Sequence, residues 1–288
     1  MTRTRVLAAL VMAPVAIAAI LLLPTPWLAA LSAVVFLVGL WEWLKLAEID
    51  DTLPRTVLLV ANLLLMVLLV WASRSSAGPS PALFQIVTLA GVAWWLLSLL
   101  WLRRFDFASD HETHARVFKL AAATLAIIPA WCALCLLHSD NFEGLLSDPG
   151  IRQGHRWLLA ALVIVWAADS GAYFAGRRFG KRKLAPRISP NKTIEGLVGG
   201  LVAGVAAGLL FASFAGLELA QIPAFIAVAI ATVLASVAGD LFESLLKRHV
   251  GAKDSGNLIP GHGGILDRVD GVLAALPVFV LGKELGGF

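Results

Sequence analysis

Charge is scarce in this chain: Asp, Glu, Lys and Arg make up 15% of its residues, against roughly 25% in a soluble domain. Cysteine is scarcer still. Cys132 and Cys135 lie in an apolar stretch with no second cysteine pair beside them, so we interpret them as packing residues and expect neither a zinc site nor a disulfide framework. The sequence contains no GxxxxGK[ST] pattern, which excludes a P-loop nucleotide site. It also contains no repeat of fixed period, which excludes a solenoid.

Long apolar runs are what the chain has in place of charge. Hydrophobic residues make up 59% of the sequence, and the mean hydropathy is +0.84. Runs of about 18 to 22 residues recur, and each is long enough for a helix to cross a hydrocarbon core of roughly 30 Å. We therefore predict an all-α polytopic membrane protein with about nine transmembrane helices. The predicted spans are 6–23, 27–46, 56–73, 82–102, 117–138, 157–176, 194–214, 222–242 and 269–285.

The distribution of Lys and Arg predicts how these spans are oriented. If the N-terminus is cytoplasmic and the sides alternate, the far side receives only Arg74, Arg152, Arg156 and Lys283 of the 23 Lys and Arg residues. Because positive residues concentrate in cytoplasmic loops, we expect a cytoplasmic N-terminus and a C-terminus on the far side. The pI of about 9.3 then reflects loop charge that attracts anionic head groups or phosphates, and we expect no nucleic-acid partner.

The two parts of the chain differ in polar content. Residues 1–140 hold the first five spans and carry little polar material, whereas residues 157–288 hold the last four spans and most of the charged loops. We therefore predict that the second part is catalytic, with its active-site loops in the cytoplasm. Several tryptophans lie mostly near span ends, and we interpret them as anchors at the membrane interface. They are Trp27, Trp41, Trp43, Trp94, Trp95, Trp101 and Trp157.

Asp169 is an ionisable residue within the sixth span, after a mostly apolar stretch. Such a group is costly in a bilayer, so it should face the bundle interior or a wet cavity. Tyr173 and Gly176 follow at i+4 and i+7 and should share its helical face. Pairing with a neighbouring helix would explain Asp169 structurally, but the hypothesis that we favour is a ligand or metal role.

The basic loop after the sixth span ends in SPNKTIEG, residues 189–196. Ser189 and Lys192 lie there in a turn that leads directly into a helix. The exposed N–H groups and the dipole of a helix N-terminus favour a phosphate group. Part of the loop's charge is ordinary positive-inside signal, so the phosphate hypothesis rests on this closing turn.

Glycine recurs at four-residue spacing along the seventh span, at Gly196, Gly200, Gly204 and Gly208. A stripe of small residues lets another helix approach closely, so we interpret it as a packing surface. The neighbouring helix can belong to the same chain or to a second copy. A homodimer is therefore one expectation.

Acidic residues flank the segment between the last two spans. Asp240, Glu243 and Lys247 share one face at the end of the eighth span, and Asp267 and Asp270 lie at the entrance of the ninth. Two pairs of acids from different helices are thus expected to converge. Carboxylate oxygens without a cysteine or a histidine pair suit a hard cation such as Mg²⁺, which binds through one or two carboxylates, waters and substrate phosphates.

The loop between these acids, residues 251–264, is rich in glycine. Its glycines permit positive φ angles and close approach to a bound group. We interpret His262 in this loop as a group that touches a phosphate, rather than as a metal ligand. The flanking acids and cations, together with the loop, predict a polyphosphate site. The cations are Lys247, Arg248, Lys253 and Arg268.

The segment from Ser244 to Asp270 resembles the C-terminal motif of the phosphatidate cytidylyltransferases (CDP-diacylglycerol synthases). Every fixed element of that motif has a counterpart here: Ser244, Lys247, Arg248, Lys253, Asp254, Gly256, Pro260, His262, Gly263, Gly264, Asp267, Arg268 and Asp270. Upstream, Asp169 with Tyr173, and the segment 189–196, also look like polar elements of this family. The resemblance covers roughly residues 157–285, and the first five spans fit it only as generic membrane helices.

The resemblance implies transfer of a cytidylyl group from CTP to phosphatidic acid, which gives CDP-diacylglycerol and pyrophosphate. It also implies Mg²⁺, as one or two cations, and an active site at the cytoplasmic face of the bacterial inner membrane. The expected catalytic residues are Asp240, Asp267, Lys247, Arg248, Lys253 and Asp169. The expected phosphate-binding residues are Lys192, Ser189, His262, Gly263, Gly264 and Arg268. The expected metal ligands are Asp240 and Asp267, with Asp169 and Asp270 as further candidates.

Two alternatives stay open at the level of sequence. Another CTP-dependent membrane enzyme, acting on a polyprenol or a different lipid phosphate, would use the same kind of site. An ion-coupled transporter would use intramembrane acids such as Asp169. The transporter hypothesis predicts polar residues at bilayer midplanes and inverted repeats, whereas the polar residues of this chain gather at one face.

Overall fold

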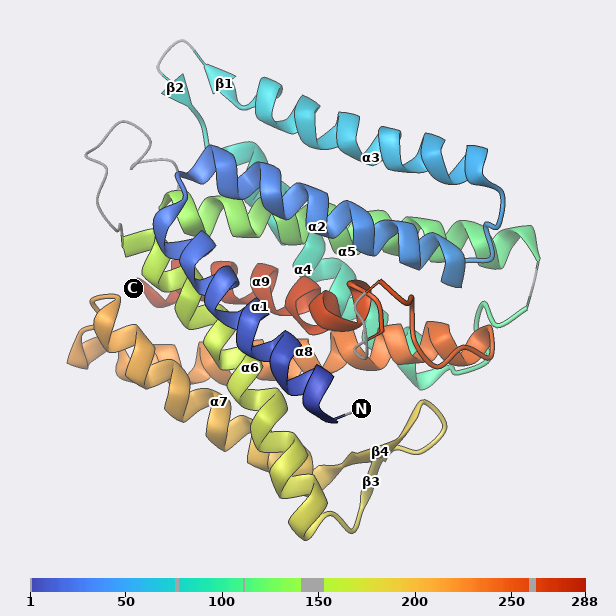
Figure 1. Ribbon diagram of the computed structural model, residues 1–288. Coiled ribbons are helices and arrows are strands. Elements are labelled where there is room, and N and C mark those ends of the chain that lie inside the picture. The colour runs from blue at the N-terminus through green and yellow to red at the C-terminus, as the bar shows by residue number, and fades with distance from the viewer. Residues whose placement is uncertain (1, 76–77, 111, 141–152, 259–262) are drawn as a thin grey trace.

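The computed structural model describes residues 2–75, 78–110, 112–140, 153–258 and 263–288 of the chain. Within these residues the chain forms nine long α-helices (Figure 1). They are α1 (Thr2–Leu22), α2 (Thr25–Leu46), α3 (Thr52–Ala72), α4 (Ala82–Arg103), α5 (Thr113–Ser139), α6 (Gln153–Phe179), α7 (Ile194–Phe214), α8 (Ile222–His249) and α9 (Leu266–Gly286). A short 3₁₀ helix, η2 (Leu219–Gln221), precedes α8. Two antiparallel hairpins pair β1 (Arg74–Ser75) with β2 (Gly78–Pro79) and β3 (Lys183–Ala185) with β4 (Ser189–Thr193).

Seven helices in the described part of the chain, α2 to α8, are long and apolar enough to cross a membrane. Helix α9 is of similar length but carries five charged residues, Asp267, Arg268, Asp270, Lys283 and Glu284. In α1 the apolar segment is Met12–Leu22, which is shorter than these seven helices. An all-α integral membrane protein is therefore confirmed, whereas the count of nine spans and the orientation of the termini stay predictions.

Four of the tryptophans predicted to lie at the interface are in the core instead: Trp43, Trp95, Trp101 and Trp157. Trp43, Trp95 and Trp101 are buried around Phe242 of α8, with ring centroids 5.9, 6.0 and 5.2 Å from that ring. Their indole N–H groups donate to the backbone carbonyls of Lys119, Leu273 and Phe107. The interface interpretation is wrong for all four, because an indole near a helix end can also be buried, for example where a carbonyl accepts its N–H. Trp27, by contrast, is exposed.

The glycine stripe of α7 packs against α6, as Figure 1 shows for the two helices. A Cβ on Gly196 would lie 3.0 Å from the carbonyl oxygen of Ala172, and one on Gly200 would lie 2.9 Å from that of Ala168. Both distances are tighter than ordinary contacts, so only glycine allows the helices to come this close. The packing role of the stripe is confirmed. Because the contact lies within one chain, the stripe itself does not argue for a homodimer.

Helices α5 and α3 differ strongly in burial. The apolar window of α5 is 78% buried, and both free cysteines, Cys132 and Cys135, are buried in it, in line with their packing role. The window of α3 is only 22% buried. Helix α3 packs mainly against α2 and lies at the edge of the bundle in Figure 1. The centre of the molecule is thus α5, α8 and α9, with α3 as a peripheral helix.

Candidate active site

The β3–β4 hairpin brings Lys192 to α8. The hairpin ends at Thr193, whose Oγ1 accepts a hydrogen bond from the N–H of Gly196 at 3.1 Å and so caps α7, a common stabilising arrangement at a helix start. One residue earlier, Lys192 Nζ lies 2.5 Å from Asp240 Oδ2. The turn that the sequence predicts to bind phosphate is therefore held against a predicted metal ligand.

A pocket of about 580 Å³ opens beside this ion pair, between α6, the start of α7, and α8. We call it the Asp169 pocket. Asp169, Tyr173, Lys192 and Asp240 are among its lining residues, as is Gly176, so the predicted shared face of α6 is confirmed. The rest of the lining is largely apolar: Ala168, Ala172, Leu184, Leu197, Val233 and Val237. The pocket thus joins a polar end that carries charges of both signs to an apolar wall.

Two further charged residues act electrostatically on this polar end. Asp169 lies within electrostatic reach of Asp240, Lys192 and Arg268. Asp270, at the start of α9, lies within reach of Asp240 and Asp169. One Asp270 oxygen, Oδ1, accepts a hydrogen bond from the N–H of Gly271 at 2.8 Å. Three of the predicted acids, from α6, α8 and α9, therefore approach one region.

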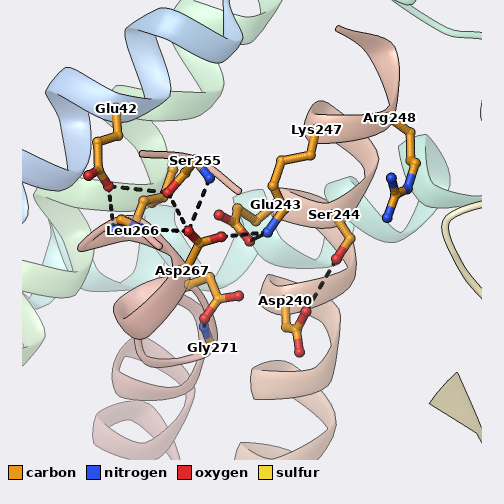
Figure 2. A network of polar contacts seen from close by, with 12 residues as sticks. Glu42, Asp240, Glu243, Ser244, Lys247, Arg248, Ser255, Leu266, Asp267 and Gly271 are labelled. Carbon is orange, nitrogen blue, oxygen red and sulfur yellow. Dashed lines mark hydrogen bonds and ion pairs between the residues drawn. The ribbon is translucent and has the colours of Figure 1, made fainter. Parts of the chain in front are cut away.

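Asp267 belongs to a second, more buried cluster (Figure 2). Lys247 Nζ lies 2.5 Å from Glu243 Oε2 and 2.7 Å from Asp267 Oδ1. The other carboxylate oxygen, Asp267 Oδ2, accepts hydrogen bonds from Ser255 N and Oγ, both at 3.0 Å, and from Gly264 N at 2.8 Å. Asp267 thereby ties both ends of the glycine-rich loop to α9 and, through Lys247, to α8.

Glu42 of α2 completes this cluster, and the sequence reasoning missed it. Its Oε2 accepts hydrogen bonds from Leu266 N at 2.7 Å and from Ser255 Oγ at 3.2 Å. A Cβ on Gly256 or Gly264 would collide with the Glu42 carboxylate, so the two glycines leave the room that it occupies. We call Glu42, Glu243, Lys247, Ser255 and Asp267 the loop network. A carboxylate inside the apolar run of the second span was the available signal, since such a group is costly without partners.

The remaining predicted residues lie around these two clusters. Arg248 donates from Nε to the carbonyl of Ile188 in the β3–β4 turn at 3.2 Å. Ser189 is partly buried in β4, and Lys253 and Arg268 are exposed. Gly263 has a φ of +80°, a conformation that side chains disfavour, and with Gly264 it lies against Asp267 and Glu42 respectively. His262 lies outside the described residues.

The model of the cytidylyltransferase family matches residues 3–284. The chain belongs to the cytidylyltransferase family. Two curated relatives, both called phosphatidate cytidylyltransferase, are similar over nearly their whole length. The one from Haemophilus influenzae is 36% identical over 287 residues, covering 97% of each chain. The one from Pseudomonas aeruginosa is 37% identical over 279 residues, covering 97% of this chain and 96% of its own.

A third relative is similar over a shorter stretch. The phosphatidate cytidylyltransferase of Bacillus subtilis is 46% identical, but over only 124 residues, which are 43% of this chain and 46% of its own. The family match, in contrast, extends through the early helices that include Glu42.

The acids of this cytidylyltransferase fit a hard cation only in part. Among the described residues, no group of three His, Cys, Asp or Glu side chains is placed to hold a metal ion. Mg²⁺, however, needs only one or two carboxylates when waters and substrate phosphates complete its octahedral shell. Asp240 and Asp169 at the pocket meet that requirement, with Asp270 nearby. Asp267 already has both oxygens engaged by Lys247 and the loop.

Proposed function

We propose that this protein transfers the cytidylyl group of CTP to phosphatidic acid, which gives CDP-diacylglycerol and pyrophosphate. One observation carries the proposal: Lys192, Asp240 and Asp169 converge from three segments on a pocket with a polar end and an apolar wall. Such a pocket suits a substrate with a phosphate at one end and acyl chains at the other. Membership of the family, and two relatives called phosphatidate cytidylyltransferase over 97% of this chain, support the same reaction.

In this reaction a phosphate oxygen of phosphatidic acid attacks the α-phosphorus of CTP. The bond from that phosphorus to the bridging oxygen breaks, and pyrophosphate leaves with the electron pair. The nucleophile is already an anion, so the protein needs no strong general base. Catalysis then consists of positioning and charge neutralisation. We assign this role to Lys192 at the pocket and to Arg248, Lys253, Arg268 and Lys247 around the glycine-rich loop.

We propose Mg²⁺ as the cofactor, as one or two cations. Asp240 and Asp169 would hold it at the pocket, with Asp270 and Asp267 as further ligands. When bound, the cation would neutralise charge on the phosphates of CTP. Lys192 forms an ion pair with Asp240, and Lys247 forms one with Asp267. If Asp240 held the cation, Lys192 would lose this carboxylate partner and could contact a substrate phosphate, whereas Lys247 would keep Glu243.

We further propose nine spans, with the N-terminus and the active site on the cytoplasmic side and the C-terminus on the far side. The hairpin with Lys192 and the glycine-rich loop would then face soluble CTP. A single cysteine in place of Lys183, in a chain with both native cysteines replaced by alanine, tests this orientation. It should react with a membrane-impermeant maleimide in inside-out vesicles and not in intact cells. Labelling only in intact cells would invert the orientation.

The reaction itself is tested with the full chain, purified in detergent and given CTP, MgCl₂ and phosphatidic acid. We expect CDP-diacylglycerol and pyrophosphate to appear in equal amounts. Polyprenol in place of phosphatidic acid tests the alternative function on a polyprenol, since a polyprenol kinase would release CDP instead of pyrophosphate. Release of CDP, or turnover with polyprenol alone, would overturn the proposal. All the assigned residues belong to one chain, so a homodimer would carry two such sites.

A further inference from the structure

A second pocket lies on the opposite edge of the bundle from the Asp169 pocket. It is a groove of about 410 Å³ between α2 and α3, which we call the α2–α3 groove. Its lining is entirely apolar: Val34, Leu37, Val38, Trp41, Leu59, Val60, Leu63 and Leu258. Figure 1 shows α3 at the edge of the bundle, well away from α6 and α7. Both helices are apolar enough to span a membrane, so lipid acyl chains surround the groove.

Arg55 lies at one end of this groove. Arg55, Leu59 and Leu63 are spaced four residues apart, so they share the face of α3 that is turned toward α2. The guanidinium lies over the ring of Trp41, with Cζ 4.9 Å from the ring centroid. Since Trp41, Leu59 and Leu63 all line the groove, the cation is at its head. Only a few residues connect α2 to α3, so this head is the end where the α2–α3 connection lies.

The guanidinium of Arg55 is buried, and two of its nitrogen atoms have no hydrogen-bond partner. The residue is only 9% exposed, and neither Nε nor Nη2 has a hydrogen-bond partner. A buried guanidinium without an anion is costly, and the contact with Trp41 supplies only part of the compensation. A guanidinium pairs well with the oxygens of a phosphate. The missing partner is therefore an anion that reaches the groove.

We propose that the α2–α3 groove binds one molecule of an anionic glycerophospholipid, separate from the lipid that reacts. The phosphate pairs with the Arg55 guanidinium beside Trp41, and an acyl chain occupies the groove between α2 and α3. A lipid fits better than a free phosphate ion because the remainder of the site is apolar and faces the bilayer. It fits better than a second protein chain because the buried group needs a negative charge.

The groove also touches the catalytic side of the molecule. Leu258, which lines the groove, belongs to the same loop as Ser255, and Ser255 hydrogen-bonds both Glu42 and Asp267. Trp41 and Glu42 are adjacent on α2, so one turn of this helix borders the groove and also contacts the loop network. The bound lipid therefore contacts the part of the chain that fixes the loop.

Native mass spectrometry of the full chain in detergent tests this site, with phosphatidylglycerol and phosphatidylcholine as the probes. We expect one phosphatidylglycerol to bind at least about tenfold tighter than phosphatidylcholine, because hydrogen bonds to a charged group are strong. Arg55→Leu should abolish this preference, and Arg55→Lys should keep part of it. Arg103→Leu removes an exposed arginine from a helix end and should leave the preference intact, as should Lys192→Ala at the other pocket.

A second variant keeps the test decisive if Arg55→Leu does not fold. Leu63→Trp fills the groove while Arg55 stays, and it should remove the tightly bound lipid. Retention of the phosphatidylglycerol preference in either variant would overturn the proposal. So would a change from dimer to monomer in Arg55→Leu without any change in lipid binding, since the groove would then be an interface between two copies.

Discussion

The two charged clusters of the candidate active site differ in how exposed their side chains are and in how many partners those side chains already have. At the Asp169 pocket the side chains of Lys192 and Asp240 are 24% and 36% exposed, and they form a single ion pair. In the loop network Lys247, Glu243 and Asp267 are 11%, 1% and 8% exposed, and Asp267 has partners on both oxygens. Both clusters contain lysine and carboxylates, yet only the first has groups that a ligand can reach without breaking several hydrogen bonds.

This difference separates ligand binding from loop positioning. An exposed ion pair contributes little to stability and can exchange its partner for a metal ion or a phosphate. A buried, hydrogen-bonded pair is strongly destabilised when one member is removed. Substitutions in the two clusters should therefore give different combinations of lost activity and lost stability, and the predictions below use that contrast.

Replacement of Asp267 should have the largest effect, on both properties. Asp267→Asn removes one of the two carboxylates that hold Lys247, and it disturbs the hydrogen bonds to Ser255 and Gly264. We expect a loss of about 3 kcal/mol in the free energy of unfolding and at least a hundredfold drop in kcat. Thermal unfolding in detergent and initial rates would measure them. Loss of activity without any loss of stability would move Asp267 to the ligand-binding group.

Replacement of Asp240 should affect activity alone. Asp240→Asn breaks the partly exposed pair with Lys192, so we expect a stability change below about 1 kcal/mol but a drop in kcat of about a hundredfold or more. Asp106→Asn is the control, because it breaks the exposed pair with Arg187, and neither residue lines the pocket. If Asp240→Asn destabilised the chain as much as Asp267→Asn does, the two clusters would not differ in the way described.

Glu42 should act through the loop, with a smaller effect. Glu42→Ala leaves Leu266 N without its acceptor and removes one of the two acceptors of Ser255 Oγ. The change should cost about 2 kcal/mol and lower kcat roughly tenfold through misplacement of the loop. Glu42→Gln keeps one acceptor oxygen and should recover part of both. Glu112→Ala, at an exposed position, serves as the control. Equal damage by the Ala and Gln variants would argue against this positioning role.

The smallest effect should come from the glycines that make room for Glu42. Gly256→Ala places a methyl group against the Glu42 carboxylate, and crowding of this kind costs about 1 to 2 kcal/mol. Gly39→Ala, on the same helix as Glu42, meets its nearest neighbour at 3.8 Å and should be tolerated. In the double variant Glu42→Ala with Gly256→Ala, the total loss of stability should be smaller than the sum of the two single-variant losses. Full additivity would mean that the two residues do not interact.

The sequence predicted the elements of the site better than their grouping. The helices, the shared face of Asp169 and Tyr173, and the packing role of the glycine stripe followed from spacing alone, since a helix repeats every few residues. The pairing of Lys192 with Asp240, and the separation of Asp267 from the pocket, depend on how helices pack. Local periodicity carries no information about that. The roles of individual residues in binding and catalysis stay predictions.

Glu42 and the core tryptophans show why the remaining contacts could not be predicted from the sequence. The position of Glu42 in an apolar run signals a need for partners, but nothing in the surrounding residues indicates that they are Ser255 and Leu266. Trp43, Trp95 and Trp101 have the composition and position of interface residues, and only their neighbours distinguish the two environments. In each case the deciding contact joins segments that are far apart along the chain.

The bond from Leu266 to Glu42 spans 224 residues, and this separation constrains the order of assembly. During synthesis α2 leaves the ribosome long before the glycine-rich loop, so the Glu42 carboxylate must wait without its partners until the last helix arrives. Contacts of such long range form late and slowly. The active site should therefore be the last part of the protein to become ordered. A nascent chain released before α9 would have membrane helices in place but no organised catalytic loop.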